Sequence, residues 1–195
     1  MGTGTVLLLI FVGVIFYSVS LYNRLVAARN AYKNAFAQID VQLTRRHDLI
    51  PNLIEIAKGY MSHEKETLQA VIEARNTAIS DLSAAKTDPG NLAALEKLGA
   101  TERGLSGALG RLFALSESYP DLKANENMMQ LSEELTTTEN KISFARQAFN
   151  DGVMLYNNLR EQFPSNLISD WFSFKEATLL ELESDSMKTV PKVEF

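Results

Sequence analysis

Hydrophobic positions follow two different patterns along this chain. Residues Val6–Leu21 form an almost unbroken apolar run, and the first charged side chain is Arg24. From Tyr22 onward, apolar residues instead recur every three or four positions, which places them on one face of an α-helix. No alternating strand pattern occurs in the sequence. It therefore predicts an all-α protein with a single N-terminal transmembrane helix followed by an antiparallel bundle of long helices.

The apolar run has three possible interpretations. A membrane span needs roughly 20 mostly apolar residues, which Thr3–Tyr22 supplies, whereas buried core helices have shorter runs of about 10 to 14. A cleaved signal peptide needs a basic segment before the run and a small-x-small cleavage site. Ser18–Ser20 has that form, but no Lys or Arg precedes the run and the helical pattern continues beyond it. We favour a retained transmembrane helix, with residues 1–23 as the short N-terminus and span.

Charges beside the run predict its orientation. The basic residues that follow it are Arg24, Arg29, Lys33, Arg45 and Arg46, against one acidic residue, Asp40. Lys and Arg next to a span prefer the cytoplasmic side. We therefore expect a single-pass protein of the cell membrane with its N-terminus outside and its domain in the cytoplasm. Arg24, Arg29 and Lys33 form a predicted membrane-interface collar, worth about 1 kcal/mol per charge near anionic headgroups. Arg45 and Arg46 are expected in helix-surface ion pairs.

The anchor and the first helix of the domain are predicted to be continuous, because no Gly or Pro occurs between Tyr22 and Ile50. Pro51 predicts either a kink or a break. The helical spacing continues across it, which favours a kink. Gly59 and Ser62 suggest a weak point before the next segment.

Three further long helices are expected in a bundle domain spanning residues 24–175. They cover His63–Ala85, about Asn91–Ser116 with Asp88 as N-cap, and a segment from the N-cap Asn125 to Phe163. The last carries an a/d-type seam, typical of a coiled coil, at Met128, Leu131, Leu135, Thr138, Ile142, Ala145, Phe149, Gly152, Tyr156 and Leu159.

Four glycines, Gly99, Gly104, Gly107 and Gly110, lie within the third of these helices. Each costs roughly 0.8 to 1 kcal/mol against alanine. We expect them to allow close approach of a neighbouring helix. A phosphate-binding loop is not supported, since the segment lacks the required Lys-Ser/Thr ending and preceding strand.

After Pro164 an aromatic stretch is expected to form a short helix or turn that closes one end of the bundle. It contains Leu167, Ile168, Trp171, Phe172 and Phe174. The alternative is a membrane-interface patch around Trp171, because Trp favours that depth. Residues 176–195 are expected to form a flexible tail.

Composition limits the chemistry. The net charge is −5 with a basic membrane-proximal segment, so the outer body is acidic, which argues against nucleic-acid binding. With no cysteine and two histidines, little is available for a transition metal. His47 and His63 stand sixteen residues apart, about 24 Å along a straight helix. No Glu is followed by His three residues later, which is the pattern that a di-metal carboxylate bundle requires. We predict no cofactor, metal or catalytic residues, and no enzymatic activity.

Several segments resemble the LemA family, the most distinctive being Ile39–Tyr60, which reads IDVQLTRRHDLIPNLIEIAKGY. The others are Tyr22–Tyr32, the run ending at Leu115, Tyr119–Asn140 and Ala145–Pro164. This resemblance implies a membrane-anchored helical protein with a short outside N-terminus and no established catalytic activity. Some members are linked to magnetosome membranes.

Three functional hypotheses follow. The first is an interaction, scaffold or assembly module whose partners are the lipid bilayer and a protein partner or a homo-oligomer. The second is a self-associating membrane-shaping or membrane-organising protein. The third, and weakest, is an enzyme built on His47, His63 and nearby carboxylates.

Overall fold

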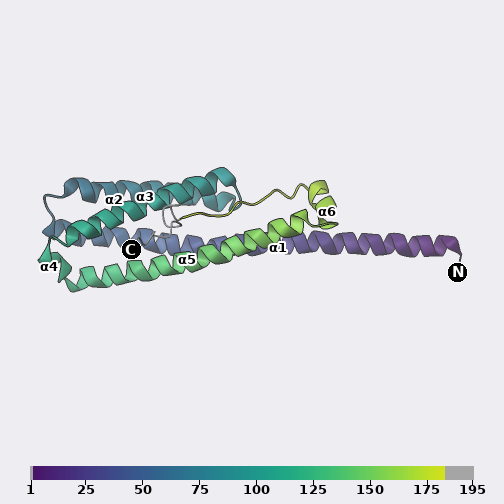
Figure 1. The fold of residues 1–195 in the computed structure, drawn as a ribbon, viewed down its shortest axis with the longest axis horizontal. Helices are drawn as coiled ribbons and strands as arrows, with labels where there is room; N and C mark the ends of the chain where they lie inside the picture. Colours follow the sequence, from purple (N-terminus) through teal and green to yellow (C-terminus); the bar gives the residue numbers. More distant parts are fainter. Residues whose placement is uncertain (1, 183–195) are drawn as a thin grey trace, which may run out of the picture.

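The computed structural model describes residues 2–182, in which all regular structure is helical. The helices are α1 (Thr3–Tyr60), α2 (Lys65–Thr87), α3 (Leu92–Ser116), α4 (Pro120–Lys123), α5 (Glu126–Glu161) and α6 (Ser165–Trp171). Figure 1 shows a bundle from which the N-terminal part of α1 projects as a single rod. The predicted all-α class is confirmed.

Helix α1 is one uninterrupted helix of 58 residues, roughly 87 Å long at the usual rise per residue. Its first part is exposed; Phe16, for example, is 72% exposed. From Leu21 onward it buries one residue every three or four positions, as the sequence predicts. Helix α1 also continues through Pro51, so the proline does not break it. The anchor and the first bundle helix are therefore one element.

The four long helices pack as two antiparallel pairs, α1 with α5 and α2 with α3. The predicted seam forms the buried face of α5, where Met128, Leu135, Thr138, Ile142, Phe149 and Tyr156 are buried. Gly152 marks a close approach of α5 to α1. A Cβ atom there would lie 3.2 Å from both Cα and Cβ of Tyr32.

Side-chain caps set two helix starts. Asn125 accepts a hydrogen bond from the backbone N–H of Met128 at 3.1 Å, which confirms it as N-cap. The N-cap predicted at Asp88 is wrong. Helix α3 starts at Leu92, and Asn91 caps it by accepting from the N–H of Ala94 at 3.1 Å.

The expected role of the α3 glycines is also corrected. A Cβ atom at Gly104, Gly107 or Gly110 would meet nothing within 4 Å, so these glycines do not admit a neighbouring helix. Only Gly99 is approached closely, and the approaching group is the backbone carbonyl of Glu181 rather than a helix.

The prediction that a flexible tail begins at residue 176 is wrong for residues 176–182, which pack against the bundle. Residues 174–182 run in extended form along the bundle, with Ala177 and Leu180 buried. Asn157 pairs with both backbone groups of Ala177 (2.7 and 3.1 Å), and Asn150 pairs with both backbone groups of Leu180 (3.2 and 2.9 Å). Residues 183–195 of the expected tail lie outside the described residues.

The spacing of these two asparagines matches the spacing of the residues they hold. Seven helical residues rise about 10.5 Å. Three residues of extended chain span about 10 Å. Asn150 and Asn157 can therefore each pair with the backbone N–H and carbonyl of one residue in an antiparallel segment. We call residues 174–182 the C-terminal strap.

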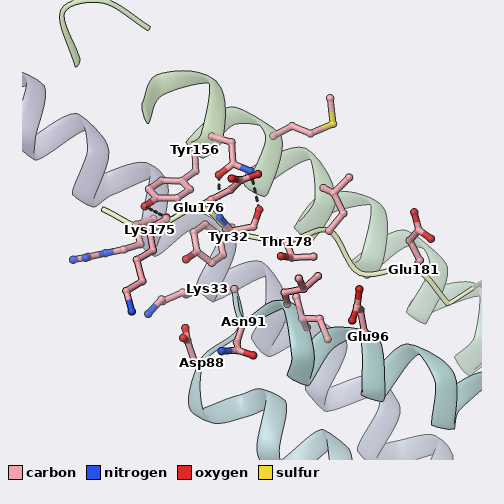
Figure 2. A pocket seen from close by; sticks show the side chains of 18 of the residues that line it. Tyr32, Lys33, Asp88, Asn91, Glu96, Tyr156, Lys175, Glu176, Thr178 and Glu181 are labelled. Carbon is pink, nitrogen blue, oxygen red and sulfur yellow. Dashed lines mark hydrogen bonds between the residues drawn. The ribbon is translucent and has the colours of Figure 1, made fainter. Parts of the chain in front are cut away.

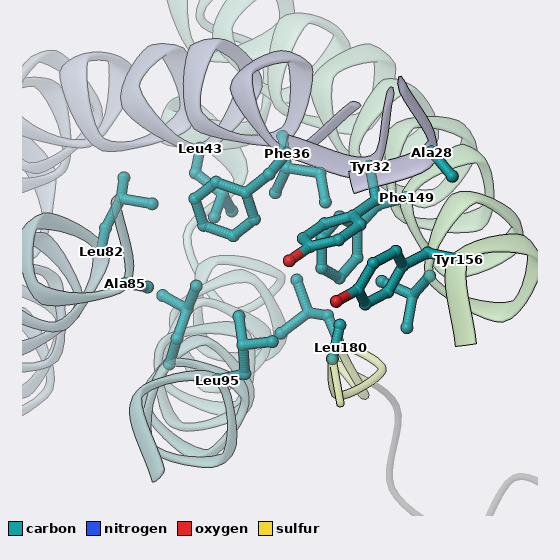
Figure 3. Packing of buried hydrophobic residues seen from close by; sticks show 14 of the residues in the cluster. Ala28, Tyr32, Phe36, Leu43, Leu82, Ala85, Leu95, Phe149, Tyr156 and Leu180 are labelled. Carbon is teal, nitrogen blue, oxygen red and sulfur yellow. The ribbon is translucent and has the colours of Figure 1, made fainter. Parts of the chain in front are cut away.

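The core consists of two clusters along the bundle axis. The membrane-proximal cluster contains Tyr32, Phe36, Phe149 and Tyr156 together with Leu180 of the C-terminal strap, which points into it (Figure 3). The aromatic rings of Tyr32 and Phe36 meet Phe149 at centroid distances of 6.1 and 5.6 Å. The distal cluster is aliphatic and lies around Ile50, Leu53, Val71, Leu105, Leu112 and Leu135.

Two glycine substitutions test this packing. Gly152→Leu is expected to destabilise the fold by about 1–3 kcal/mol, because the added side chain must displace the α1 backbone at Tyr32. Gly107→Ala is the matched control and is expected to stabilise by about 1 kcal/mol, since its Cβ enters open space in a helix interior. Urea unfolding of the detergent-solubilised protein measures both. Equal effects of the two changes would contradict the close α1–α5 contact.

Candidate functional site

A layer of polar side chains separates the two core clusters. Arg46 and His47 lie on α1 between Leu43 of the proximal cluster and Ile50 of the distal one. Glu102 on α3 and Thr138 on α5 occupy equivalent positions between leucine and isoleucine residues of the two clusters. These four side chains define the polar layer, and the whole residues are 1–4% exposed.

Glu102 joins the charged members of the polar layer. Its Oε2 lies 3.2 Å from Nη1 of Arg46, and its Oε1 lies 2.9 Å from Nε2 of His47. Arg46 also donates from Nη2 to the Ser106 hydroxyl at 2.6 Å and contacts Oε2 of Glu139 at 3.4 Å. The expectation that Arg46 forms a surface ion pair is therefore wrong. Tertiary packing places it inside, where the buried Glu102 carboxylate compensates its charge.

Arg75 on α2 bonds to the backbone of the polar layer at His47. Pro51 has no N–H, so the carbonyl of His47 lacks the helical hydrogen bond that residue 51 would otherwise supply. The Nε–H of Arg75 on α2 donates to this carbonyl at 2.6 Å. The proline is thus tolerated inside α1 because a neighbouring helix satisfies the acceptor it leaves free.

The two histidines do not form a common site. His47 belongs to the polar layer, and α1 continues for thirteen residues beyond it to Tyr60, a rise of about 20 Å. His63 follows that helix end and is exposed. Groups that share a proton in catalysis must lie within hydrogen-bonding distance or one water of each other. Within residues 2–182, no group of three or more His, Asp or Glu side chains is placed to hold a metal ion.

A groove of about 1250 Å³ lies beside the C-terminal strap (Figure 2). Its charged lining residues are four basic ones, Arg29, Lys33, Arg103 and Lys175, and four acidic ones, Asp88, Glu96, Glu176 and Glu181. Because these charges balance, the lining as a whole favours neither an anion nor a cation.

Tyrosines at the groove and at the distal end remain protonated. Burial, with added repulsion from Tyr156 and Asp88, raises the pKa of Tyr32 to about 12. Burial also raises the pKa of Tyr156, whose hydroxyl donates to the carbonyl of Lys175 at 2.7 Å. The hydrogen bond from Tyr119 to Glu64 raises the pKa of Tyr119. None of these shifts prepares a tyrosine to act as a base at neutral pH.

The exposed N-terminal part of α1 matches a bilayer span. Helix α1 contains an 18-residue window of mean hydropathy 2.3, of which 6% is buried. A core helix of similar composition would be mostly buried, so the exposure of this segment indicates a membrane span rather than a core helix.

The predicted membrane-interface residues have different surroundings. Arg24 and Lys33 are exposed, and Lys33 also lines the groove. Arg29 is half-buried, and its guanidinium carbon lies 5.0 Å above the ring centroid of Phe174. Trp171, at the end of α6, is 84% exposed.

Helix α6 lies against α1 and α5 at the bundle end nearest the exposed part of α1 (Figure 1). The ring of Phe172 lies 4.8 Å from that of Tyr22, and Phe174 lies 5.6 Å from the same ring. The aromatic stretch therefore closes the bundle where the membrane anchor begins.

Comparison with known proteins identifies the family. The LemA family model matches residues 35–195, most of the chain. The chain belongs to the LemA family. It is 28% identical to Protein LemA of Metamycoplasma hominis over 149 residues, covering 76% of this chain and 60% of that protein. This LemA-family chain therefore spans less than two thirds of that relative's length.

Other relatives carry a different name. The chain is 24% identical to the magnetosome protein MamQ of Magnetospirillum gryphiswaldense, over 90% of this chain and 72% of that protein. It is 22% identical to magnetosome protein MamQ 2 of Paramagnetospirillum magneticum, over 80% of this chain and 63% of that one. Together with the exposed apolar part of α1, these relatives indicate a membrane-associated helical protein.

Sequence reasoning missed two features of this region. The polar layer was hidden because Glu102 is separated from Arg46 by more than fifty residues, and no local pattern links them. The C-terminal strap did leave a signal. Asn150 and Asn157 lie two helical turns apart on one face of α5, and Ala177 and Leu180 have matching spacing.

Paired glutamate substitutions test the polar layer. Glu102→Ala is expected to destabilise the protein by about 3–5 kcal/mol, because it leaves the buried Arg46 charge without its main acceptor. Glu139→Ala removes the other carboxylate near Arg46, but Glu139 is 55% exposed. It should therefore cost less than about 1 kcal/mol. Thermal unfolding of both variants measures the difference. Similar losses of stability in the two variants would show that Glu102 contributes no more to the polar layer than the exposed Glu139 does.

Proposed function

We propose that this chain is a membrane-anchored, non-catalytic scaffold that holds a helical interaction module at a fixed position beside the bilayer. The observation that carries the proposal is the continuity of α1. The residues exposed for lipid contact and those buried in the bundle, beginning at Leu21 and Leu25, belong to one helix without a hinge. The bundle therefore has a defined orientation relative to the span, which is useful for presenting a binding surface and unnecessary for a freely tethered enzyme.

Exposed apolar side chains on α5 support a protein partner. Phe144 is 72% exposed, and Met154 and Leu155 are 54% and 55% exposed. These residues lie outside the buried seam of α5, so the fold does not require them to be apolar. The proposed interaction surface is this outward side of α5, and the proposed occupant is a different protein.

A second candidate function is self-association that organises the membrane. The relatives named as magnetosome proteins favour it, because they link this family to a membrane compartment. In this case the outward side of α5 would contact a second copy of the chain.

Photocrosslinking separates these functions. A p-benzoylphenylalanine residue in place of Phe144 in the full chain is expected to trap a different protein in intact cells, because this apolar side chain faces outward. The same residue at Ser80, exposed on α2, is the matched control and should trap little. An adduct of twice the chain's mass at position 144 would support self-association instead. Equal trapping at both positions would contradict a specific surface on α5.

We also propose that the N-terminus faces outside and the bundle lies in the cytoplasm, because the basic residues after the span favour that side. Protease treatment should leave the bundle intact in spheroplasts and digest it in inverted membrane vesicles, detected with an antibody against the C-terminus. Digestion in spheroplasts would reverse the topology, and the partner would then be sought outside the cytoplasm.

A further inference from the structure

Helix α6 buries two serines and exposes large apolar side chains, which is the reverse of what is usual for a helix at a water-facing surface. Its serines face inward, with Ser165 at 7% and Ser169 at 1% exposure. Of its three apolar side chains, Ile168 packs against the proximal cluster, whereas Leu167 (58% exposed) and Trp171 (84% exposed) face outward. Phe163, just before the helix, is 80% exposed. In water, burial of apolar surface favours the reverse arrangement, at roughly 25 cal/mol per Å².

Specific contacts hold α6 in this orientation. The Ser169 hydroxyl lies within hydrogen-bonding distance of the carbonyl oxygens of Arg160 (3.0 Å) and Asn166 (2.9 Å). On the far side, Phe174 is buried beside Tyr22 and begins the C-terminal strap. Rotation of α6 to bury Trp171 would break these contacts. The outward aromatic surface is therefore a fixed feature of the fold.

The position of this surface identifies its surroundings. Phe172 packs on Tyr22, the last residue of the apolar stretch Thr3–Tyr22, and the first charge of the chain, Arg24, follows two residues later. Helix α6 thus lies beside the part of α1 where the apolar stretch ends and the bundle begins (Figure 1). Trp and Tyr are enriched at the ends of membrane spans, because their rings are apolar and their N–H or O–H groups bond to water and headgroups.

We infer that α6, with Phe163, is a second membrane contact whose outward side chains enter the interface of the bilayer that α1 spans. With the span it gives the protein two points of contact, which brace the bundle against tilting. The inference rests on the membrane span of the proposed function but not on a protein partner.

The attraction is apolar rather than electrostatic. Between Phe163 and Phe172 the one charged residue is Asp170, so α6 itself carries no positive charge to attract anionic lipid. Binding of α6 is therefore expected in zwitterionic vesicles and should depend little on salt. The collar of Arg24, Arg29 and Lys33 would show the opposite behaviour.

Trp171 reports on this contact directly, because it is the chain's one tryptophan. The full chain is reconstituted into phosphatidylcholine vesicles in which some lipids carry bromine near the headgroup end of their acyl chains. We expect blue-shifted emission from Trp171, strong quenching by the brominated lipids and several-fold weaker quenching by aqueous acrylamide than in the control. The control is the double variant Trp171→Phe, Val41→Trp, which moves the indole to a position on α1 that is 56% exposed, lies farther along the bundle and is not part of the proposed surface on α5.

Two results would overturn the inference. Water-like emission from Trp171 with acrylamide quenching equal to the control would show that α6 stays in water. Protection from acrylamide without quenching by brominated lipid would place the aromatic surface against protein. The double variant is expected to fold because both exchanged side chains are exposed, and circular dichroism checks this. None of these readouts depends on a protein partner, so a failure here differs from a failure of the scaffold proposal.

Discussion

The structure depends on one constraint: α1 joins an exposed apolar segment to the buried face of the bundle within a single helix. For the membrane span proposed for that segment, an uninterrupted helix is needed, because backbone groups in hydrocarbon can bond only to one another. Beyond Tyr22 the same helix supplies the central apolar face of the bundle. Because the helix has no hinge, the rotation of that face is fixed relative to the span. The positions of α5, α6 and the C-terminal strap then follow from packing against α1.

The polar layer serves a different purpose from the two apolar clusters. Apolar side chains on long parallel faces can slide by one turn at modest cost, whereas a buried carboxylate held by Arg46 and His47 cannot. A buried ion pair adds little net stability but strongly penalises the arrangements that separate its members. We interpret Glu102 as the residue that fixes the position of α3 along α1. The bond from Arg75 to the carbonyl freed by Pro51 fixes α2 at the same level.

The C-terminal strap links this level of the bundle to the membrane end. Asn150 and Asn157 bond to its backbone at the spacing of two helical turns, and Tyr156 adds a bond to the carbonyl of Lys175. The strap continues directly from α6 through Phe174, whose ring is covered by Arg29. The basic residue expected to face lipid thus helps to hold the aromatic end of the bundle, while the exposed surface at that end is aromatic.

The sequence by itself determined the long apolar segment at the start of α1, the four long helices, the buried seam of α5, the cap at Asn125 and the continuity of α1. Each rests on interactions within a few residues, which a local pattern records. Only the tertiary structure decided that Arg46 is buried, that Gly152 rather than the α3 glycines marks a close helix contact, and that residues 176–182 belong to the domain. It also decided that Ser169 faces inward and Trp171 outward. These outcomes depend on groups far away in the chain, such as Glu102, Tyr32 and Arg160. A side chain's free energy of burial is set by the partners that meet it there, and their positions are not encoded in its neighbours along the sequence.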